Sequence, residues 1–321
     1  MLLCFNKHFY KPGAIRKSNV KETSDVDANA DVIKTYIARF GFMPEHSFEY
    51  FRCHVDEGSP HFIYDDDMGV LCFVSKEGKE RVIETLVEPL TQLPKAQAIK
   101  RLVEYAIGEK GYGKVILETR REIRDELAKA LEGTGYRVLK PRYSLTWPVF
   151  IMNNFDETLS GGKWKKIRYF KNKLFRDHAV EVDDFRDSDR ETLKELVKSW
   201  SRRRTAGDRA YCKSYLRMID EAFPGFDMAK VIRISGKPVS VFGGWKVVNS
   251  DTYYSCIGIY DYDIENLGEV SNVLDLECIK KLGAKKADFG GGEEALTSFK
   301  KKFFPDEFYV TDKYAVAKER K

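Results

Sequence analysis

The stretch AKKADFGGGEEALTSFKKKFFP, residues 284–305, decides the fold. It begins with a short apolar strand whose last residues are Ala287, Asp288 and Phe289. The strand is followed by three consecutive glycines, Gly290, Gly291 and Gly292. Glycine lets a backbone approach a ligand closely or adopt a positive φ. The stretch therefore predicts a strand that ends in a glycine turn, which either approaches a ligand closely or needs positive φ angles.

A helix is expected directly after the glycines. Two glutamates open it, where negative charge suits the N-terminal end of the helix dipole. Its apolar residues then recur at spacings of three and four, at Leu296, Phe299 and Phe303. Lys300 comes next to a residue of this buried stripe, so we separate it from Lys301 and Lys302. Those two lysines are typical of a solvated helix end.

Composition limits the class of protein. With 321 residues, 13% aromatic and 33% charged, the chain has room for two globular domains, and a net charge of +5 does not indicate a general polyanion binder. The six cysteines form no CxxC pair, which favours free thiols in a reducing cytoplasm. No apolar run approaches the roughly 20 residues of a membrane helix, and the N-terminus lacks the apolar region of a signal peptide. We expect a cytoplasmic protein.

The two halves of the chain repeat one pattern. Apolar periodicity in the first half predicts the order β-β-β-α-β-α-β, ending with a long strand over residues 136–147. An offset of 172 residues carries 69–75 onto 241–247, 95–109 onto 267–281 and 115–117 onto 287–289. We therefore expect an α/β fold with mixed sheets and two tandem domains, 1–149 and 150–321.

Basic residues collect where the second half begins. A segment without any acidic residue carries Lys163, Lys165, Lys166, Arg168, Lys171, Lys173 and Arg176. Its apolar residues share one side of a predicted helix, which leaves the cations on the other faces. Three further cations follow at Arg202, Arg203 and Arg204. Either these are solvated surface charges, or they contact the phosphates of a partner, for which the family resemblance described next implies tRNA.

The closing stretch, DFGGG followed by a leucine and FKxxFxP, resembles the closing motif of the Fem-type aminoacyltransferases and of the C-terminal domain of phosphatidylglycerol lysyltransferases. That resemblance implies two tandem GNAT-like domains. It also implies transfer of an amino acid from aminoacyl-tRNA to an amine, a peptide or a lipid headgroup, with peripheral membrane contact as one possibility. The first half has Leu127 and Ala128 where the second has Phe299 and Lys300, so we expect a single active site, with the first half degenerate.

The resemblance and the chemistry of the residues suggest roles for the site. Lys300 suits stabilisation of an oxyanion or contact with a substrate phosphate. Phe299 would shape the site through its backbone carbonyl, as the resemblance implies. Asp288 could hold the α-ammonium of the aminoacyl group or act as a base, or it could cap the glycine turn. Asn266 and Tyr254 join the three glycines as expected substrate-binding residues.

The sequence also bears on which molecule donates the acyl group. GNAT enzymes that use acyl-CoA carry an R/Q-x-x-G-x-G/A turn that holds the pyrophosphate at a helix N-terminus. Residues 265–271 and 91–97 stand at the equivalent places and do not fit, because Pro94 removes an amide and Glu265 and Glu269 add negative charge. This favours aminoacyl-tRNA as donor, with no cofactor or metal. Acyl-CoA-dependent N-acyl transfer and a non-catalytic RNA-binding module are the alternatives.

Overall fold

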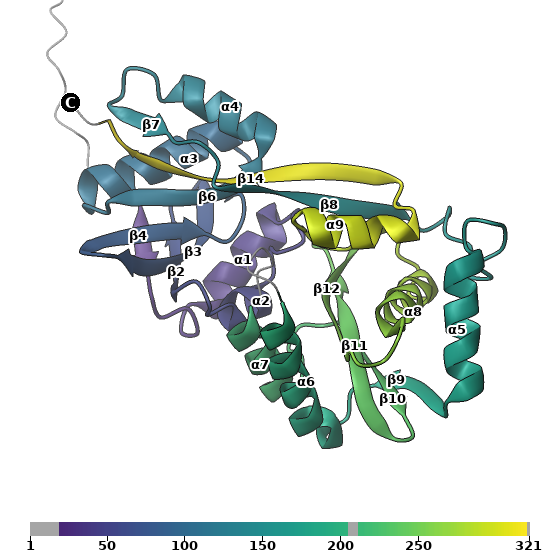
Figure 1. The fold of residues 1–321 in the computed structure, drawn as a ribbon. Coiled ribbons are helices and arrows are strands. Elements are labelled where there is room, and N and C mark those ends of the chain that lie inside the picture. The colour runs from purple at the N-terminus through teal and green to yellow at the C-terminus, as the bar shows by residue number, and fades with distance from the viewer. Residues whose placement is uncertain (1–18, 205–210, 320–321) are drawn as a thin grey trace, which may run out of the picture.

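One mixed sheet runs through both halves of the chain in the computed structural model, which describes residues 19–204 and 211–319 (Figure 1). The N-terminal half, residues 19–151, contains β1 (Lys21–Thr23), α1 (Ala30–Phe40), α2 (Phe48–Cys53), β2 (Ser59–Tyr64), β3 (Met68–Glu77), β4 (Glu80–Thr85), β5 (Leu90–Thr91), α3 (Lys95–Val103), the π-helical turn η1 (Glu104–Glu109), β6 (Lys114–Arg120), α4 (Arg121–Ala130), β7 (Tyr136–Val138) and β8 (Tyr143–Ile151).

The C-terminal half, residues 152–319, repeats this order with one added helix, α5, before its first strand. It contains α5 (Lys165–Asp177), β9 (Val180–Asp184), the 3-10 turn η2 (Asp187–Asp189), α6 (Arg190–Arg203), α7 (Cys212–Asp220), β10 (Met228–Ile234), β11 (Lys237–Lys246), β12 (Thr252–Tyr260), α8 (Leu267–Lys281), β13 (Lys286–Asp288), α9 (Glu294–Lys300), η3 (Lys301–Phe303) and β14 (Glu307–Lys318). The helices and strands that the 172-residue offset pairs, such as α3 with α8 and β6 with β13, are of the same type.

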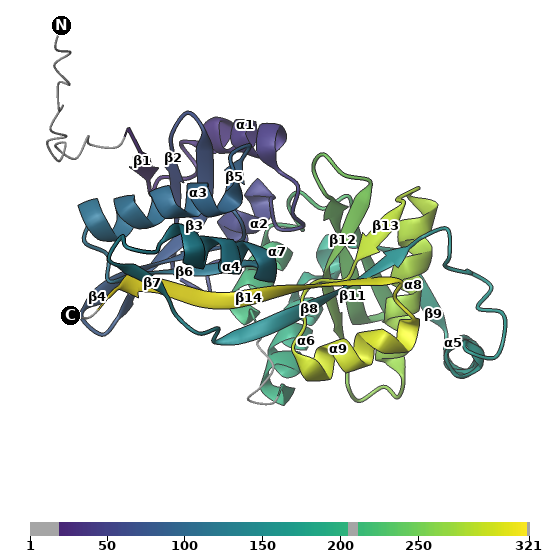
Figure 2. The same cartoon turned by 90° about the horizontal axis from the view of Figure 1, so that it is seen from above.

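The two halves share their longest strands. The central order of the sheet is β6-β14-β8-β13, so the last strand of the C-terminal half lies next to β6 of the N-terminal half. Residues 311–317 of β14 pair with β6 on one side, while residues 307–313 pair with β8 on the other. β8 in turn pairs with β13 through residues 149–151. Figure 2 shows β14 and β8 crossing from one half into the other. The predicted boundary after residue 149 falls within β8.

The long strand predicted for residues 136–147 is wrong in one respect, because it is interrupted. β7 and β8 are separate strands that pair with the same side of β14. Pro141 lies between them and has no backbone N–H to donate, so the hydrogen-bonded pairing with β14 is interrupted there. The amides of Leu139 and Arg142 still donate to carbonyls of β14, at 2.8 and 2.7 Å, which keeps both pieces in line.

Three apolar clusters account for the arrangement of layers. One lies between α3, α4 and the N-terminal part of the sheet, and a second lies between α5, α8 and the C-terminal part. The third is built by both halves: α1 and α2 meet α6 and α7 there, with Phe51, Phe73, Val197 and Trp245 buried among them. Because this shared core removes apolar surface of both halves from water, it holds the two halves together. The predicted α/β fold with a mixed sheet is confirmed.

Two properties expected from composition can be checked against the described residues. Within residues 19–204 and 211–319, no helix combines the length and apolar character that crossing a bilayer requires. The described cysteines, which exclude Cys4, are free thiols. The N-terminal segment that we tested for a signal peptide, and Cys4 with it, lie outside the described residues.

Candidate active site

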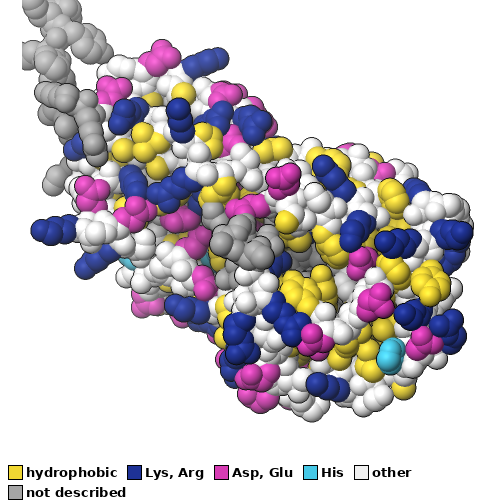
Figure 3. All heavy atoms as spheres, viewed as in Figure 1, with side chains coloured by type: hydrophobic (Ala, Val, Ile, Leu, Met, Phe, Trp, Pro, Cys, Tyr) yellow, Lys and Arg dark blue, Asp and Glu magenta, His cyan; other side chains and the backbone are white. Residues whose placement is uncertain are grey.

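A cavity of about 330 Å³ lies between the two halves. Its volume is at the lower end of the range for small-molecule sites. The surface is hollowed over this junction, with apolar side chains beside the hollow (Figure 3). The N-terminal half supplies polar and aromatic lining residues that include Glu45, Tyr50, His54, Glu57, Glu118 and Trp147. The C-terminal half supplies Trp200, Arg204, Tyr215, Tyr254, Asn272, Gly290, Gly291, Phe299, Lys300 and Lys313, among others.

The three glycines form the turn between β13 and α9. Gly290 has a φ of +74°, a conformation that side chains disfavour. A Cβ on Gly291 would lie 2.7 Å from the indole of Trp147, so the missing side chain makes room for that ring. Gly292 exchanges two backbone hydrogen bonds with Thr146 of β8, at 2.9 and 3.0 Å. The turn is thereby fixed against the shared strand, and Gly290 and Gly291 face the cavity.

Lys300 is the buried cation of this turn. Lys300 is 8% exposed, and its Nζ donates to the backbone carbonyls of Phe289 and Gly290, the latter at 3.0 Å. Burial lowers its pKa to about 8, and the nearby Asp288 carboxylate acts in the opposite direction. Lys301 and Lys302 are exposed. Since an ammonium has three N–H donors, two carbonyls leave one for a ligand in the cavity.

Asp288 lies behind the turn rather than in the wall of the cavity. One carboxylate oxygen accepts from the amide of Gly290 at 2.8 Å, and the other accepts from the hydroxyl of Tyr309 at 2.8 Å. Burial raises its pKa to about 6, against these two hydrogen bonds and the charge of Lys300. Both oxygens are therefore used inside the protein. Of the three roles expected for Asp288, this geometry suits the cap of the glycine turn.

Carboxylates line the opposite wall. Glu45, Glu57 and Glu118 face the cavity together with Lys313, which is 3% exposed. The nearest carboxylate to Lys313 is Glu84 at 2.6 Å, while Glu57 and Glu118 lie 3.9 and 3.8 Å away. This surrounding charge raises the pKa of Lys313 although burial opposes it. The wall built by the N-terminal half and β14 is therefore acidic, and the wall that carries Lys300 is basic.

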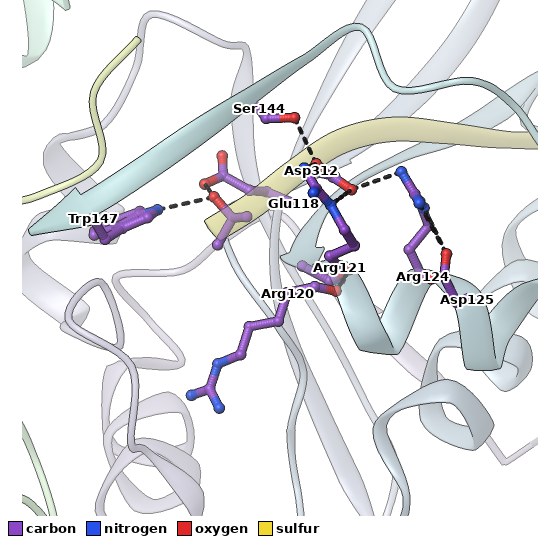
Figure 4. Close-up of polar contacts among 10 residues, drawn as sticks. Glu118, Arg120, Arg121, Arg124, Asp125, Ser144, Trp147 and Asp312 are labelled. Carbon is purple, nitrogen blue, oxygen red and sulfur yellow. Dashed lines mark hydrogen bonds and ion pairs between the residues drawn. The ribbon is translucent and has the colours of Figure 1, made fainter. Parts of the chain in front are cut away.

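Hydrogen bonds and ion pairs join the shared strands β8 and β14 to β6 and α4 (Figure 4). The indole N–H of Trp147 donates to the hydroxyl of Thr311 at 2.9 Å, and Thr311 donates to Glu118 at 2.9 Å. One residue further along β14, the buried Asp312 accepts from Ser144 at 2.6 Å and pairs with Arg121 and Arg124, at 3.2 and 2.6 Å. These bonds fix β14 against both β6 and β8. Trp147 and Glu118, which both line the cavity, are consequently held near one another through Thr311.

The basic segment lies away from the cavity. Its cations fall on and just before α5, which packs on α8 at the outer flank of the C-terminal half (Figures 1 and 2). Lys171 pairs with Glu277, Lys173 with Glu265 and Arg176 with Asp177. Arg168 donates to the carbonyls of residues 159 and 161. Lys163, Lys165 and Lys166 are exposed. Contact of this surface with tRNA stays a prediction.

The remaining predicted residues divide between the cavity and its surroundings. Tyr254 and Phe299 line the cavity, whereas Asn266 does not and adopts φ +60° just before α8. Arg204 also lines it and stacks on Trp200 at 4.4 Å. Arg203 pairs with Asp263 through two 2.7 Å contacts, and Arg202 is exposed.

Sequence reasoning missed the acidic wall. Glu45 comes from the loop before α2, Glu57 from the loop after it and Glu118 from β6. These residues share no motif and are far apart in the sequence, and only the fold of the N-terminal half brings them to one side of the cavity. Asn272, which faces the cavity from α8, carries no local signal either. The aromatic part of the lining did have a signal in the sequence: aromatic residues make up 13% of the chain, and tyrosines and tryptophans form much of the cavity lining.

The fold and the position of the site define the class: this is a tandem GNAT-like fold with a cavity at the junction of its two units. No protein-family model matches the sequence, and no curated protein matches it significantly. Solved structures do match it. The C-terminal domain of a putative lysylphosphatidylglycerol synthetase from Agrobacterium fabrum has a TM-score of 0.59 and 15% identity, over 91% of this chain and 92% of that one.

Two further structures place the fold. FemX matches with a TM-score of 0.61 and 11% identity, covering 93% of this chain and 97% of its own. A tandem GNAT protein from the clavulanic acid biosynthesis pathway matches with a TM-score of 0.52 and 6% identity, covering 94% and 98%. The predicted resemblance to Fem-type and lysyltransferase-type proteins is thus confirmed for the fold.

Proposed function

We propose that this protein is an acyltransferase that moves an amino acid from an aminoacyl-tRNA ester to a nucleophile in the cavity. The observation that carries this proposal is Lys300, a buried ammonium held on two backbone carbonyls with one N–H left for the cavity. The solved structures with the same fold include one named as a lysylphosphatidylglycerol synthetase domain, which agrees with transfer of this kind.

The reaction needs positioning and charge stabilisation more than acid–base chemistry, because the ester of an aminoacyl-tRNA is already activated. The acceptor amine or hydroxyl attacks the ester carbonyl, a new amide or ester bond forms, and the bond to the terminal ribose breaks. The acceptor's proton passes to the departing ribose oxygen. Holding the two reactants together can lower the barrier by about 7–11 kcal/mol. The free N–H of Lys300 would donate to the oxyanion that develops on the carbonyl.

Acyl-CoA is the less suitable donor on structural grounds. In the first turn of α8, Gly268 lies directly against the ring of Tyr260, so close that a Cβ there would be 2.4 Å from the ring. Glu269 lies in the same turn and pairs with Lys302, and Glu265 lies just before it and pairs with Lys173. A pyrophosphate at this helix N-terminus would meet an aromatic ring and two carboxylates instead of open amides. In the N-terminal half, Pro94 is the residue before α3.

The acceptor would be a small amine, a peptide or a lipid headgroup, and the tRNA would contact the exposed cations around α5. The flexible, single-stranded acceptor end would reach the cavity while the body of the tRNA stays on the flank. Contacts of lysine with phosphates position an RNA without reading its sequence. The exposed Lys163, Lys165 and Lys166 are the cations best placed for this role.

The test is a transfer assay with charged total tRNA, labelled amino acid, and lipid or cytosol extract as the source of acceptor. Lys300→Met should lower turnover by about 10²–10³-fold, the usual effect of removing one oxyanion donor, while tRNA affinity stays unchanged. Lys301→Met, at the exposed neighbour, should transfer like the wild type. Equal turnover of Lys300→Met and wild type would refute the role of Lys300. Absence of transfer with retained tRNA binding would favour the non-catalytic RNA-binding module, and thermal protection by acetyl-CoA would favour a CoA donor.

A further inference from the structure

Asp275, on α8, is a buried carboxyl group without a charged partner. It is 2% exposed, and its Oδ1 has no hydrogen-bond partner in the described part of the chain. Burial raises its pKa to about 7, and no cation of the described residues opposes that shift. A buried carboxyl group in this condition destabilises the native state, so its presence calls for an explanation.

Ser255, on β12, joins this carboxyl group to the cavity. Its hydroxyl donates to Asp275 Oδ2 at 2.5 Å. Ser255 lines the cavity, whereas Asp275 lies behind the lining. A serine hydroxyl can accept a hydrogen bond from a ligand while it donates its own proton to another group. Ser255 is therefore a contact through which a group in the cavity can exchange a proton with Asp275.

The strand register places Ser255 at the end of the pairing that leads to the glycine turn. β12 and β13 pair in parallel as far as Tyr254 and Asp288. The next residues are Ser255 on β12 and Phe289 on β13, and the carbonyl of Phe289 is one of the two that hold Lys300. Ser255 and Lys300 both line the cavity. The serine hydroxyl and the proposed oxyanion donor thus belong to one site.

The other ionisable groups around Asp275 are neutral or paired. Its charge acts on Tyr253 of β12 and on Cys278 of α8, and burial raises the pKa of both side chains, that of Cys278 to about 11. Lys230 of β10, which acts on Cys278, pairs with Asp184 at 2.8 Å. Asp275 is therefore the group of this cluster that can gain and lose a proton near neutral pH.

We propose that Ser255 and Asp275 form a proton relay for the transfer reaction. The acceptor amine or hydroxyl gives a proton to Ser255 Oγ as it attacks the ester carbonyl, and Ser255 passes its own proton to Asp275. When the bond to the ribose breaks, the protons move back and the ribose oxygen leaves as a hydroxyl, so no net proton is gained or lost. This inference rests on the proposed function and supplies its base. Ser255 touches the substrate, and Asp275 acts through Ser255.

The test is the same transfer assay, run at pH 6, 7 and 8 with matched variants. Ser255→Thr keeps the hydroxyl, and Ser255→Val has nearly the same shape without it, so the effect of the extra methyl group is common to both. Asp275→Asn removes the base and keeps the volume. At pH 8 Ser255→Val and Asp275→Asn should be slower than wild type by about 10²-fold, the lower end of the range for general acid–base catalysis. Ser255→Thr should stay within about threefold of wild type.

The pH dependence separates a relay from a structural role. The relay needs the Asp275 carboxylate, whose fraction falls from about 0.9 at pH 8 to about 0.1 at pH 6 when the pKa is about 7. Wild type therefore loses the relay on acidification, and the deficit of Asp275→Asn relative to wild type should shrink by about tenfold. Titration of the acceptor itself cancels in this ratio, because every variant receives the same acceptor.

Ser271→Ala is the control. Ser271 is a buried serine of the same helix that bonds to Ser240 at 2.9 Å and lies outside the cavity lining, so this variant should follow wild type at each pH. Thermal melts check the fold of each variant, and the Thr and Val variants decide the matter if Asp275→Asn does not fold.

Two outcomes would overturn the relay and leave the transfer standing. One is equal turnover of Ser255→Val and Ser255→Thr. The other is an Asp275→Asn deficit that is the same at pH 6 and pH 8, which would assign Asp275 a purely structural role. A wild type that transfers no amino acid at any pH would instead refute the proposed function, and the relay with it.

Discussion

The burial of Lys300 should be visible in the dependence of stability on pH. In the native protein burial lowers the pKa of this lysine to about 8, whereas an unfolded chain has a lysine pKa of about 10.4. Between these two pH values the unfolded chain holds a proton that the native protein has released. The free energy of unfolding therefore rises as pH rises from about 8 to about 10.4, and this contribution is absent below pH 8.

The magnitude follows from the separation between the two pKa values, which corresponds to about 3 kcal/mol. Lys300→Met deletes the titration and keeps most of the volume of the side chain. It also leaves the carbonyls of Phe289 and Gly290 without their donor, at a pH-independent cost of about 1–3 kcal/mol. Relative to the variant, wild type should gain about 3 kcal/mol of stability across the window.

Urea unfolding at pH 7.5, 8.5, 9.5 and 10.5 measures this difference, with Lys301→Met as the control. The exposed Lys301 has no such burial, so that variant should follow the wild type at every pH. Parallel curves for wild type and Lys300→Met would refute the reasoning, because they would mean that Lys300 titrates alike in the native and unfolded states.

Three further predictions test other parts of the structure. Gly291→Ala places a Cβ 2.7 Å from the Trp147 indole, so urea denaturation should show a free energy of unfolding lower by about 1–3 kcal/mol. The control Gly162→Ala has open space around the new Cβ and should change this free energy by less than about 0.5 kcal/mol. Arg233 and Asp189 are both buried, and Arg233 Nε donates to the Asp189 carboxylate at 3.0 Å. Arg233→Met leaves the Asp189 carboxylate buried without its cation, so the free energy of unfolding should fall by about 3–5 kcal/mol. Adding Asp189→Leu should recover much of that loss, and failure to do so would mean that packing rather than charge was lost. Filter binding at several salt concentrations gives the slope of the log tRNA binding constant against log salt concentration. Lys165→Ala should reduce the magnitude of this slope by about 1, and the control Lys79→Ala, in the β3–β4 turn, should leave it unchanged.

Local patterns predicted the elements of this fold well. Apolar periodicity identified the helices α3 and α9, the 172-residue offset indicated α8, and the glycines marked the end of β13. The sequence also set Lys300 apart from the two lysines after it, and the structure buries Lys300 alone of the three. These successes depend on interactions between residues close together in the chain, where spacing and turn chemistry decide the structure.

What the sequence could not reveal depends on contacts between distant segments. The place of β14 between β6 and β8 pairs residues almost 200 positions apart, and no local pattern encodes that choice. The acidic wall also depends on distant contacts, since Glu45, Glu57 and Glu118 come together only when the N-terminal half folds, with Lys313 of β14 beside them. Gly291 is instructive: its triplet predicted approach to a ligand, but the space beside it is filled by Trp147 from the other half.

The sharing of β8 and β14 has an evolutionary consequence. If the chain arose by duplication, an ancestral single unit would have kept its own final strand. Once each copy depended on the strand of the other, loss of either copy would have left exposed edges and an open core in the survivor. The N-terminal copy could then abandon its glycine turn and its lysine without being deleted. Under that history, the dependence of each copy on a strand of the other would keep the N-terminal copy in the chain whether or not it retained a site of its own.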